Sequence, residues 1–239
     1  MTKANRFAVK GKGFLYIPQY ALVYARIPKC ANTSIKSRLA ELISATAAPH
    51  PTLPIALQPT NDRFWKRCTT EAKWLKPDRF TALHDTVTSF TVIRDPLQRL
   101  QSCYREKICR AKIFPPMRRL GYRNGMDFND FVELTCSLEV CDMDVHTQPQ
   151  TFLISDSQGR LPNFIGTLEN LAADWANFSQ RMVKQGIPLG GPLDCLNSSK
   201  QQGRSDPAPE PLSPQTQRMF DLTYGADIKL HARMTAYPS

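Results

Sequence analysis

The stretch FLYIPQYALVYARIPKCANTSIKSRLAELI, residues 14–43, contains the pattern that decides the fold. Its two short apolar runs, 14–17 and 21–26, are typical of buried strands. Behind Thr33 and Ser34, apolar residues recur at the spacing of a helix. These residues are Ile35, Leu39, Leu42 and Ile43. A strand, a tight loop and a helix therefore follow one another, which is the repeating unit of an α/β sheet.

The same unit occurs a second time at 90–108. The run FTVIR, 90–94, is predicted to be a buried strand, and Pro96 suits the first position of a helix. The apolar stripe of that helix consists of Leu97, Leu100, Tyr104 and Ile108. No internal repeat is visible, and 239 residues with 41% hydrophobic side chains can bury one sizeable core. We therefore expect a single α/β domain over residues 1–239.

Further along, Asp127 is predicted to cap one helix and Thr167 another, with a short strand at 164–166 before the second. The second helix is expected to end just before Gly186. The apolar stripes are Phe128, Phe131, Val132 and Thr135 for the first helix, and Leu168, Leu171, Trp175, Phe178 and Met182 for the second. Two stretches rich in proline are predicted to be loops, namely 49–59 and 207–214.

Charge is unevenly distributed along the chain. The 31 Lys and Arg residues exceed the 21 Asp and Glu residues by ten, which favours anionic partners. One segment supplies most of this excess, since nine basic residues lie between 94 and 123. They are Arg94, Arg99, Arg105, Lys107, Arg110, Lys112, Arg118, Arg119 and Arg123. The next segment, 127–144, carries six acidic residues and no Lys or Arg, so we expect a molecule with two oppositely charged sides.

The seven cysteines form no CxxC pair and no zinc-like spacing with the four histidines, so we expect no metal site. Their odd number argues against a full disulfide framework. The amino-terminal apolar stretch is interrupted by Pro18 and Gln19 and ends at Arg26, which predicts neither a signal peptide nor a membrane span. A reducing, cytoplasmic location is the expectation.

The loop IPKCANTS, 27–34, has the features of an anion site. Backbone N–H groups at a helix start attract phosphate or sulfate oxygens, and Lys29 adds a positive charge. Thr33 and Ser34 add hydroxyl donors. The alternative is that Thr33 or Ser34 only caps the helix and Lys29 is solvated. The sequence lacks GxxxxGK[ST], so the loop of a nucleoside triphosphatase is disfavoured.

A cysteine phosphatase is a second alternative for the same loop. Cys30 lies at a helix start beside Lys29, where the pKa of a thiol can be lowered. Such an enzyme needs an arginine where this chain has Lys36, and a lysine cannot clamp a phosphate with two parallel hydrogen bonds. We therefore expect Cys30 to be a small residue that lines the loop.

The stretch IRDPLQRLQS, 93–102, predicts a second anion site. Arg94 leaves the end of a buried strand, where ligands of open α/β sheets bind, and its guanidinium can hold two phosphate oxygens. Ser102, in the second turn of the next helix, offers a further donor. The alternative is an ion pair between Arg94 and Asp95. Two anion sites at one sheet edge predict a ligand with phosphate-like groups at both ends.

Together, IPKCANTS and FTVIRDPLQRLQSCYREK resemble the paired nucleotide-binding signatures of the sulfotransferases that use 3'-phosphoadenylyl sulfate (PAPS). The resemblance is to the carbohydrate group, which includes the chondroitin and dermatan 4-O- and heparan 2-O-enzymes. It runs from about Leu15 to Leu230, because four further segments match in the same order. These segments are DVHTQPQTFLI, FIGTLENL, LNSSK and MFDLTYGADIKL.

This resemblance implies a P-loop-like three-layer α/β fold with a central, mainly parallel sheet flanked by helices. Nucleotide-binding elements would lie at about 21–45 and 90–110, and a helical part at about 168–232. The implied reaction moves a sulfo group from PAPS to a carbohydrate hydroxyl without a metal. Lys29, as a catalytic group, would neutralise charge on the bridging oxygen. The implied nucleotide ligands are Lys29, Cys30, Ala31, Asn32, Thr33 and Ser34 for the 5'-phosphosulfate, Arg94 and Ser102 for the 3'-phosphate, and Ser199 and Lys200 as a cover.

The attacking hydroxyl also needs a base, for which imidazole is suited. His146 matches a histidine of the 4-O-type enzymes and follows Asp144 by two positions. His84 lies where the 2-O-type enzymes place a histidine, with a looser match, so both stay candidates and His146 is preferred. The chain departs from many relatives in having Ala31-Asn32 where they carry glycines in the first loop.

A non-catalytic binder of nucleic acid or another polyanion is the remaining alternative, because 94–123 is so basic. The aromatic residues there, Tyr104, Phe114 and Tyr122, are too scattered for a stacking platform, so we expect no nucleic-acid partner. In an enzyme, the same block would guide an anionic glycan to the site. Acceptor recognition is expected in the loops 49–65 and 110–124.

Overall fold

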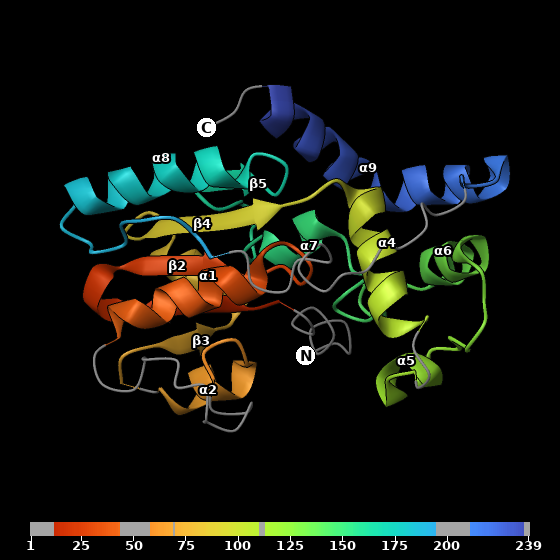
Figure 1. The fold of residues 1–239 in the computed structure, drawn as a ribbon, viewed down its shortest axis with the longest axis horizontal. Helices are drawn as coiled ribbons and strands as arrows, with labels where there is room; N and C mark the ends of the chain where they lie inside the picture. The colour runs from red at the N-terminus through yellow and green to blue at the C-terminus, as the bar shows by residue number, and fades with distance from the viewer. Residues whose placement is uncertain (1–11, 44–57, 69, 110–112, 195–210, 237–239) are drawn as a thin grey trace.

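A computed structural model describes residues 12–43, 58–68, 70–109, 113–194 and 211–236. It contains a five-stranded sheet of order β3-β1-β2-β4-β5 (Figure 1). The strands are β1 (Phe14–Ile17), β2 (Leu22–Ala25), β3 (Lys73–Leu75), β4 (Thr88–Ile93) and β5 (Phe164–Thr167). β2, β4 and β5 are parallel neighbours, whereas β1 runs antiparallel to both β2 and β3. The sheet is therefore mixed, and its parallel part lies at β2, β4 and β5.

The α-helices surround this sheet and extend beyond one of its edges. They are α1 (Asn32–Leu39), α2 (Asp62–Arg67), α3 (Pro77–Leu83), α4 (Pro96–Lys107), α5 (Pro115–Arg119), α6 (Phe128–Ser137), α7 (Gln150–Ile154), α8 (Leu171–Lys184) and α9 (Pro214–Ala236). Single 3-10 turns occupy Pro18–Tyr20 and Ala40–Leu42.

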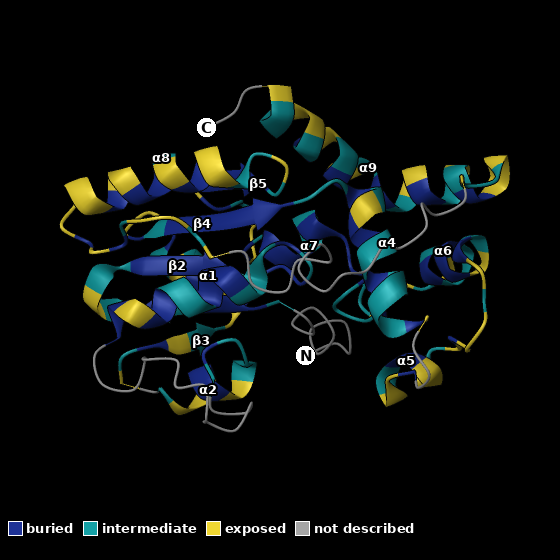
Figure 2. Ribbon diagram, viewed as in Figure 1, coloured by how far each residue is buried: buried dark blue, intermediate teal, exposed yellow. Residues whose placement is uncertain are grey.

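Alternation along the strands sends apolar side chains to both sides of the sheet. On one side Phe90 stacks between Tyr24 and Phe178, at ring distances of 5.1 and 4.3 Å, under the cover of α1 and α8. On the other side Phe14 stacks on Phe80 of α3 at 4.5 Å, in a cluster that α7 and α9 also join. Figure 2 shows the strands buried between these helices. The prediction of an α/β sheet flanked by helices is confirmed.

A second group of helices, α4, α5, α6 and α9, packs together beyond the carboxyl end of β4 (Figure 1). Its own apolar core combines aliphatic residues such as Leu100 and Met117 with aromatic residues that include Tyr122, Phe131 and Phe220. α9 joins this group to the sheet, because its Leu230 belongs to the same buried cluster as Phe14 of β1 and Ile165 of β5. The hydroxyl of Tyr224, also on α9, donates to the carbonyl of Thr147 at 2.5 Å. The carboxyl ends of the parallel strands thus face this second group of helices.

Several local predictions hold, and one needs correction. Asp127 caps α6 by accepting a hydrogen bond from the N–H of Asp130, and Gly186 follows α8 with a left-handed φ of 79°. Thr167 does not cap α8, because it ends β5 and the helix begins only at Leu171. Its backbone N–H is bound instead by the carboxylate of Asp174 at 2.7 Å.

Candidate functional site

The first loop connects β2 to α1 at the carboxyl edge of the sheet. Two of its non-glycine residues, Lys29 and Ala31, adopt left-handed φ angles of 71° and 51°. Such a conformation costs an L-residue about 1–2 kcal/mol. Ala31 is the residue before α1, and no side chain caps the helix start. The capping alternative for Thr33 and Ser34 is therefore wrong, and the first turn presents its backbone N–H groups as an anion site would.

Cys30 points into the protein rather than toward a ligand. It is fully buried, and its thiol donates to Oε1 of Gln150 at 3.3 Å. Burial raises the pKa of this thiol to about 12, so it stays protonated. Lys36 is also buried and donates to Asp62 Oδ1 at 2.7 Å. A phosphatase needs a thiolate and a phosphate clamp at these two positions, so the phosphatase alternative is contradicted.

Arg94 follows the last residue of β4, as the sequence predicted. Among the described residues, no group accepts a hydrogen bond from its buried Nε. Burial lowers the pKa of this guanidinium, and the nearby carboxylate of Glu169 partly opposes that effect. The side chain of Asp95 caps α4 by accepting from the N–H of Gln98 at 2.8 Å. A buried donor with no acceptor in the described part of the chain favours an anionic ligand at Arg94.

Gln150 joins the two loops, and sequence reasoning missed it. Its side-chain Oε1 accepts from the backbone N–H of Arg94 at 3.0 Å and from the thiol of Cys30 at 3.3 Å. Its Nε2 donates to the carbonyl of Arg94 at 2.7 Å. Asp227 of α9 holds Gln150 in place by accepting from its backbone N–H at 2.5 Å. The two predicted anion sites are therefore neighbours on one edge.

The sequence showed Arg99 only as one of nine basic residues and did not predict its structural role. It lies on α4 and is almost fully buried. Its guanidinium donates to three backbone carbonyls, those of Pro28 at 3.1 Å, Gln148 at 2.8 Å and Val145 at 3.2 Å. Pro28 precedes Lys29, and the other two carbonyls flank His146. One buried cation thus fixes the first loop against the segment that carries the preferred base.

Lys29 itself is bound by α4. Its ammonium forms an ion pair with Glu106 Oε2, and Lys107 pairs with the other oxygen at 2.9 Å. Burial alone would raise the pKa of Glu106, but hydrogen bonds from both lysines outweigh it and bring the pKa to about 2. One carboxylate thus lies between two ammonium groups at neutral pH.

His146 forms a pair with Asp144. Its Nδ1 lies 2.6 Å from Asp144 Oδ1, which also accepts from the backbone N–H of His146 at 2.9 Å. Burial would raise the pKa of Asp144, but the hydrogen bond with His146 outweighs this, and the charge of Lys107 helps to lower it further. A carboxylate on Nδ1 fixes the imidazole so that Nε2 can act as a base.

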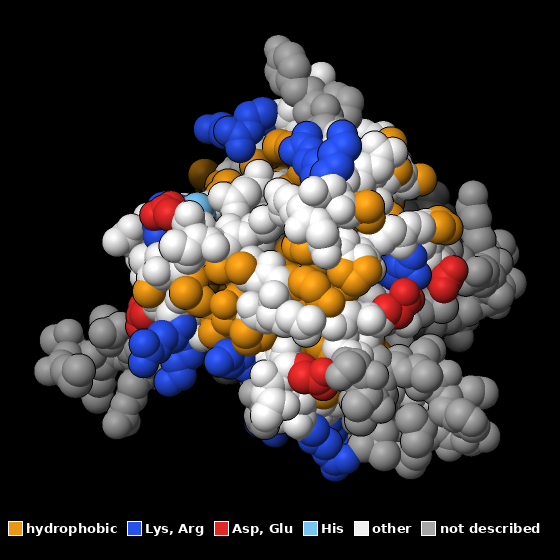
Figure 3. Space-filling view, turned by 90° about the vertical axis from the view of Figure 1, so that its left-hand side faces the viewer, with side chains coloured by type: hydrophobic (Ala, Val, Ile, Leu, Met, Phe, Trp, Pro, Cys, Tyr) orange, Lys and Arg blue, Asp and Glu red, His pale blue; other side chains and the backbone are white. Residues whose placement is uncertain are grey.

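The structure does not bring His84 to this site. It precedes β4, which begins at Thr88, so it lies at the amino-terminal edge of the parallel strands. Its Nε2 is bonded to the carbonyl of Leu161 at 2.9 Å, and its ring packs on Phe80 at 5.4 Å. Figure 3 views this edge, where hydrophobic side chains gather in the centre and Lys and Arg lie around the margin. His84 has the contacts of a structural residue.

The remaining predicted residues divide into two groups. Ser102 lies partly buried in the second turn of α4, six residues after Pro96. Ser199 and Lys200 lie outside the described residues.

Within the described part, no group of His, Cys, Asp and Glu could hold a metal, and the six cysteines there are unpaired. No helix in the same part is long and apolar enough to cross a membrane.

Comparison with known proteins gives one match. A family model described as the sulfotransferase family matches residues 12–230. No curated protein and no solved structure matches the chain. The matched range contains both loops predicted to bind anions, Gln150, the pair of Asp144 and His146, and the greater part of α9. The chain therefore belongs to the sulfotransferase family, whose activity is the transfer of a sulfo group.

Proposed function

We propose that this chain transfers the sulfo group of PAPS to a hydroxyl of a carbohydrate. The observation that carries the proposal is the link through Gln150, which joins the loop of Cys30 to the backbone of Arg94. A ligand with anionic groups at both ends, such as adenosine 3',5'-bisphosphate, suits two such sites on one sheet edge.

The donor would lie across these two sites. The guanidinium of Arg94, whose Nε has no acceptor in the described part of the chain, would hold the 3'-phosphate together with Ser102. The backbone N–H groups of residues 31–34 and the ammonium of Lys29 would hold the 5'-phosphosulfate. The closing of Ser199 and Lys200 over the nucleotide stays a prediction.

The chain's own groups then have distinct roles in an in-line transfer. His146 Nε2 would accept the proton of the acceptor hydroxyl, whose oxygen forms the new bond to sulfur. Lys29 would neutralise the charge left on the phosphate oxygen when its bond to sulfur breaks. Loss of one such preorganised donor typically costs about 3–4 kcal/mol in transition-state stabilisation. Lys29 forms an ion pair with Glu106 in this structure, so it would give up part of this ion pair when it binds the phosphosulfate of the donor.

A polyanion binder without catalysis is the competing function, and the structure weakens its main support. The basic block 94–123 is not one continuous surface, since Arg99 is buried and bonded to backbone carbonyls. Arg118 and Arg119 are exposed on α5, where an acidic glycan acceptor or another polyanion could contact them. Charge alone does not distinguish a sulfotransferase from a polyanion binder. The two functions must therefore be distinguished by which ligands the protein binds.

Thermal shift with two nucleotides tests donor binding. Adenosine 3',5'-bisphosphate should raise the melting temperature, and adenosine 5'-monophosphate should raise it much less because it lacks the 3'-phosphate. Arg94→Ala should abolish this difference, whereas Arg79→Ala, which removes an exposed arginine of α3, should preserve it. Equal shifts for both nucleotides with the unmodified protein would contradict the assignment of Arg94.

Turnover is tested with PAPS carrying labelled sulfur and a panel of acidic and neutral glycans. Transfer of label to any sugar hydroxyl supports the proposal. Tight binding of glycans or nucleic acid without a nucleotide-dependent shift, and without transfer, would establish the non-catalytic binder instead.

A further inference from the structure

Phe114, next to the charged end of α4, is unusually exposed for an aromatic residue. Three large hydrophobic side chains of the described residues are exposed: Phe114 at 49%, Val183 at 53% and Leu222 at 87%. Phe114 alone among them is aromatic. The exposed part of its ring can contact the apolar side of another ring, as aromatic side chains that line binding sites do.

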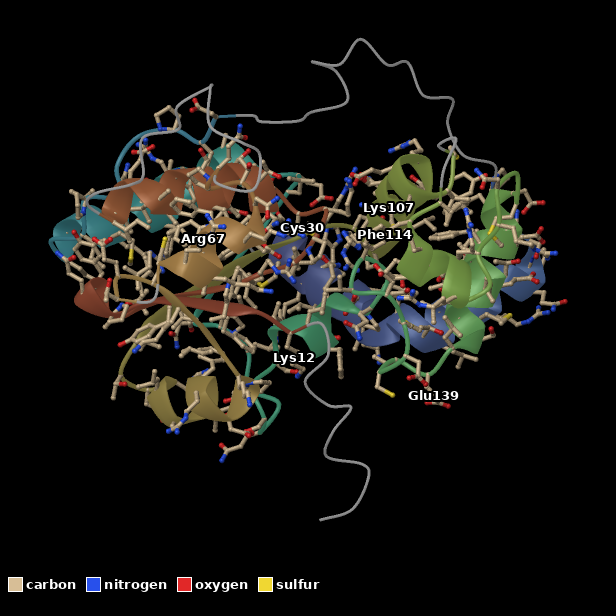
Figure 4. The ribbon with its side chains drawn as sticks, turned by 90° about the horizontal axis from the view of Figure 1, so that it is seen from below. Lys12, Cys30, Arg67, Lys107, Phe114 and Glu139 are labelled. Atoms are coloured by element: carbon tan, nitrogen blue, oxygen red, sulfur yellow. The ribbon has the colours of Figure 1, made fainter. Side chains whose placement is uncertain are left out.

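The ring of Phe114 lies beside a cation that is connected to the first loop. Lys107 Nζ is 5.8 Å from the centre of the Phe114 ring and 2.9 Å from Glu106 Oε1. The second oxygen of Glu106 pairs with Lys29. Figure 4 shows Lys107 and Phe114 close together, across from Cys30 of the first loop. Lys107 and Glu106 therefore connect Phe114 to Lys29, the lysine expected to act on the sulfo group.

We propose that Phe114 and Lys107 form the subsite for the acceptor, with a sugar ring stacked on Phe114 and its negative group paired with Lys107. This inference rests on the proposed function. A pyranose has an apolar C–H side that suits an aromatic ring, and an ammonium group has three donors. Glu106 uses one of them, which leaves donors for a carboxylate or sulfate of the acceptor.

The position of this subsite agrees with the direction of the reaction. Arg94 and Gln150 belong to the nucleotide end, whereas Lys107 lies on the far side of Glu106 from Lys29. The charge of Lys107 also helps to lower the pKa of Asp144, after the larger effects of burial and of His146, and Asp144 is the hydrogen-bond partner of the proposed base. An acceptor held here would have the base and the sulfo group within reach.

The test uses hexasaccharides of chondroitin and of N-acetylheparosan, which carry uronates, and the same sugars after reduction of their carboxyl groups. Phe114→Ala should raise the acceptor KM about tenfold for both forms, and Phe114→Tyr should restore it. Lys107→Gln should raise KM for the acidic form only, and less so at high salt. The affinity for adenosine 3',5'-bisphosphate should not change in Phe114→Ala or Phe114→Tyr.

Leu222→Ala is the matched control, because Leu222 is exposed on α9 and should leave every KM unchanged. If sulfo transfer occurs but Phe114→Ala leaves KM as it is, the subsite is wrong while the proposed function stands. Transfer to the reduced sugars but not to the acidic ones would overturn the role of Lys107. Absence of transfer to every sugar, with no nucleotide binding, would instead reject the proposed function itself.

Discussion

The side-chain amide of Gln150 forms hydrogen bonds with both backbone groups of Arg94, donating to its carbonyl at 2.7 Å and accepting from its N–H at 3.0 Å. The same oxygen accepts the thiol of Cys30. Arg94 begins the second strand–helix connection and Cys30 lies in the first, so one buried amide joins the two predicted anion sites. A nucleotide that spans both sites would therefore depend on Gln150 without touching it.

Replacement of Gln150 tests this dependence. Gln150→Leu leaves the N–H and carbonyl of Arg94 unpaired, so we expect a loss of about 1–3 kcal/mol in the free energy of unfolding. We also expect weaker binding of adenosine 3',5'-bisphosphate, because Arg94 is no longer fixed. Urea unfolding and calorimetric titration measure the two effects. Gln158→Leu, at an exposed position, is the control, and wild-type nucleotide affinity in the Gln150 variant would contradict the idea.

The parts of the fold that the sequence predicted depend on interactions between residues that are close together in the chain. The strand Phe14–Ile17 follows from a buried apolar run, and the cap at Asp127 follows from a side chain that bonds the next turn. The position of Arg94 at a strand end was predictable for the same reason. β3, Lys73–Leu75, escaped prediction because it is three residues long and only partly buried.

The links within the site could not be predicted, because they join distant segments. Arg99 bonds the carbonyl of Pro28, 71 positions away, and Asp227 bonds the N–H of Gln150 across 77 positions. No local pattern distinguishes a buried arginine from a solvated one in a basic helix. Residue type did not separate the two histidines. The resemblance preferred His146 and kept His84 as a candidate, and the placement of the strands puts His84 at the opposite end of β4.

Cys30 should be chemically inert in the folded protein. Its thiol is buried and its pKa is raised to about 12, so iodoacetamide at pH 8 should modify exposed Cys109 long before Cys30. Mass spectrometry of the digested protein at successive times measures this order. Unfolding in urea should remove the difference, which serves as the control. Rapid labelling of Cys30 in the folded state would mean that the loop opens or that the thiol is ionised.

Glu106 should make stability depend on acid pH. Its pKa in the folded protein, about 2, is below its ordinary value of 4.5, so the group stabilises the fold above pH 4.5 and this contribution is lost as the pH falls toward 2. Glu106→Gln should therefore lose less stability than the wild type between pH 5 and pH 3. Urea unfolding across this range tests it, with Glu139→Gln at an exposed position as the control. Parallel curves for wild type and Glu106→Gln would show that the pairs with Lys29 and Lys107 contribute little.

The two histidines should respond differently to replacement. His146→Ala should lower kcat by about 10²- to 10⁴-fold while leaving the affinity for adenosine 3',5'-bisphosphate unchanged, because it removes only the proton acceptor. Asp144→Asn should lower kcat as well, since the carboxylate that orients Nδ1 is lost.

His84→Ala should instead cost about 1–3 kcal/mol of stability, because the carbonyl of Leu161 loses its partner, and should keep kcat near the wild-type value. Transfer of labelled sulfur under saturating donor, together with urea unfolding of each variant, separates these effects. A large loss of kcat in His84→Ala at full stability would place the chemistry at the other edge of the sheet. It would then be incompatible with the roles of Lys29 and His146, because a proton acceptor at the amino-terminal ends of the strands cannot reach a hydroxyl held beside the first loop.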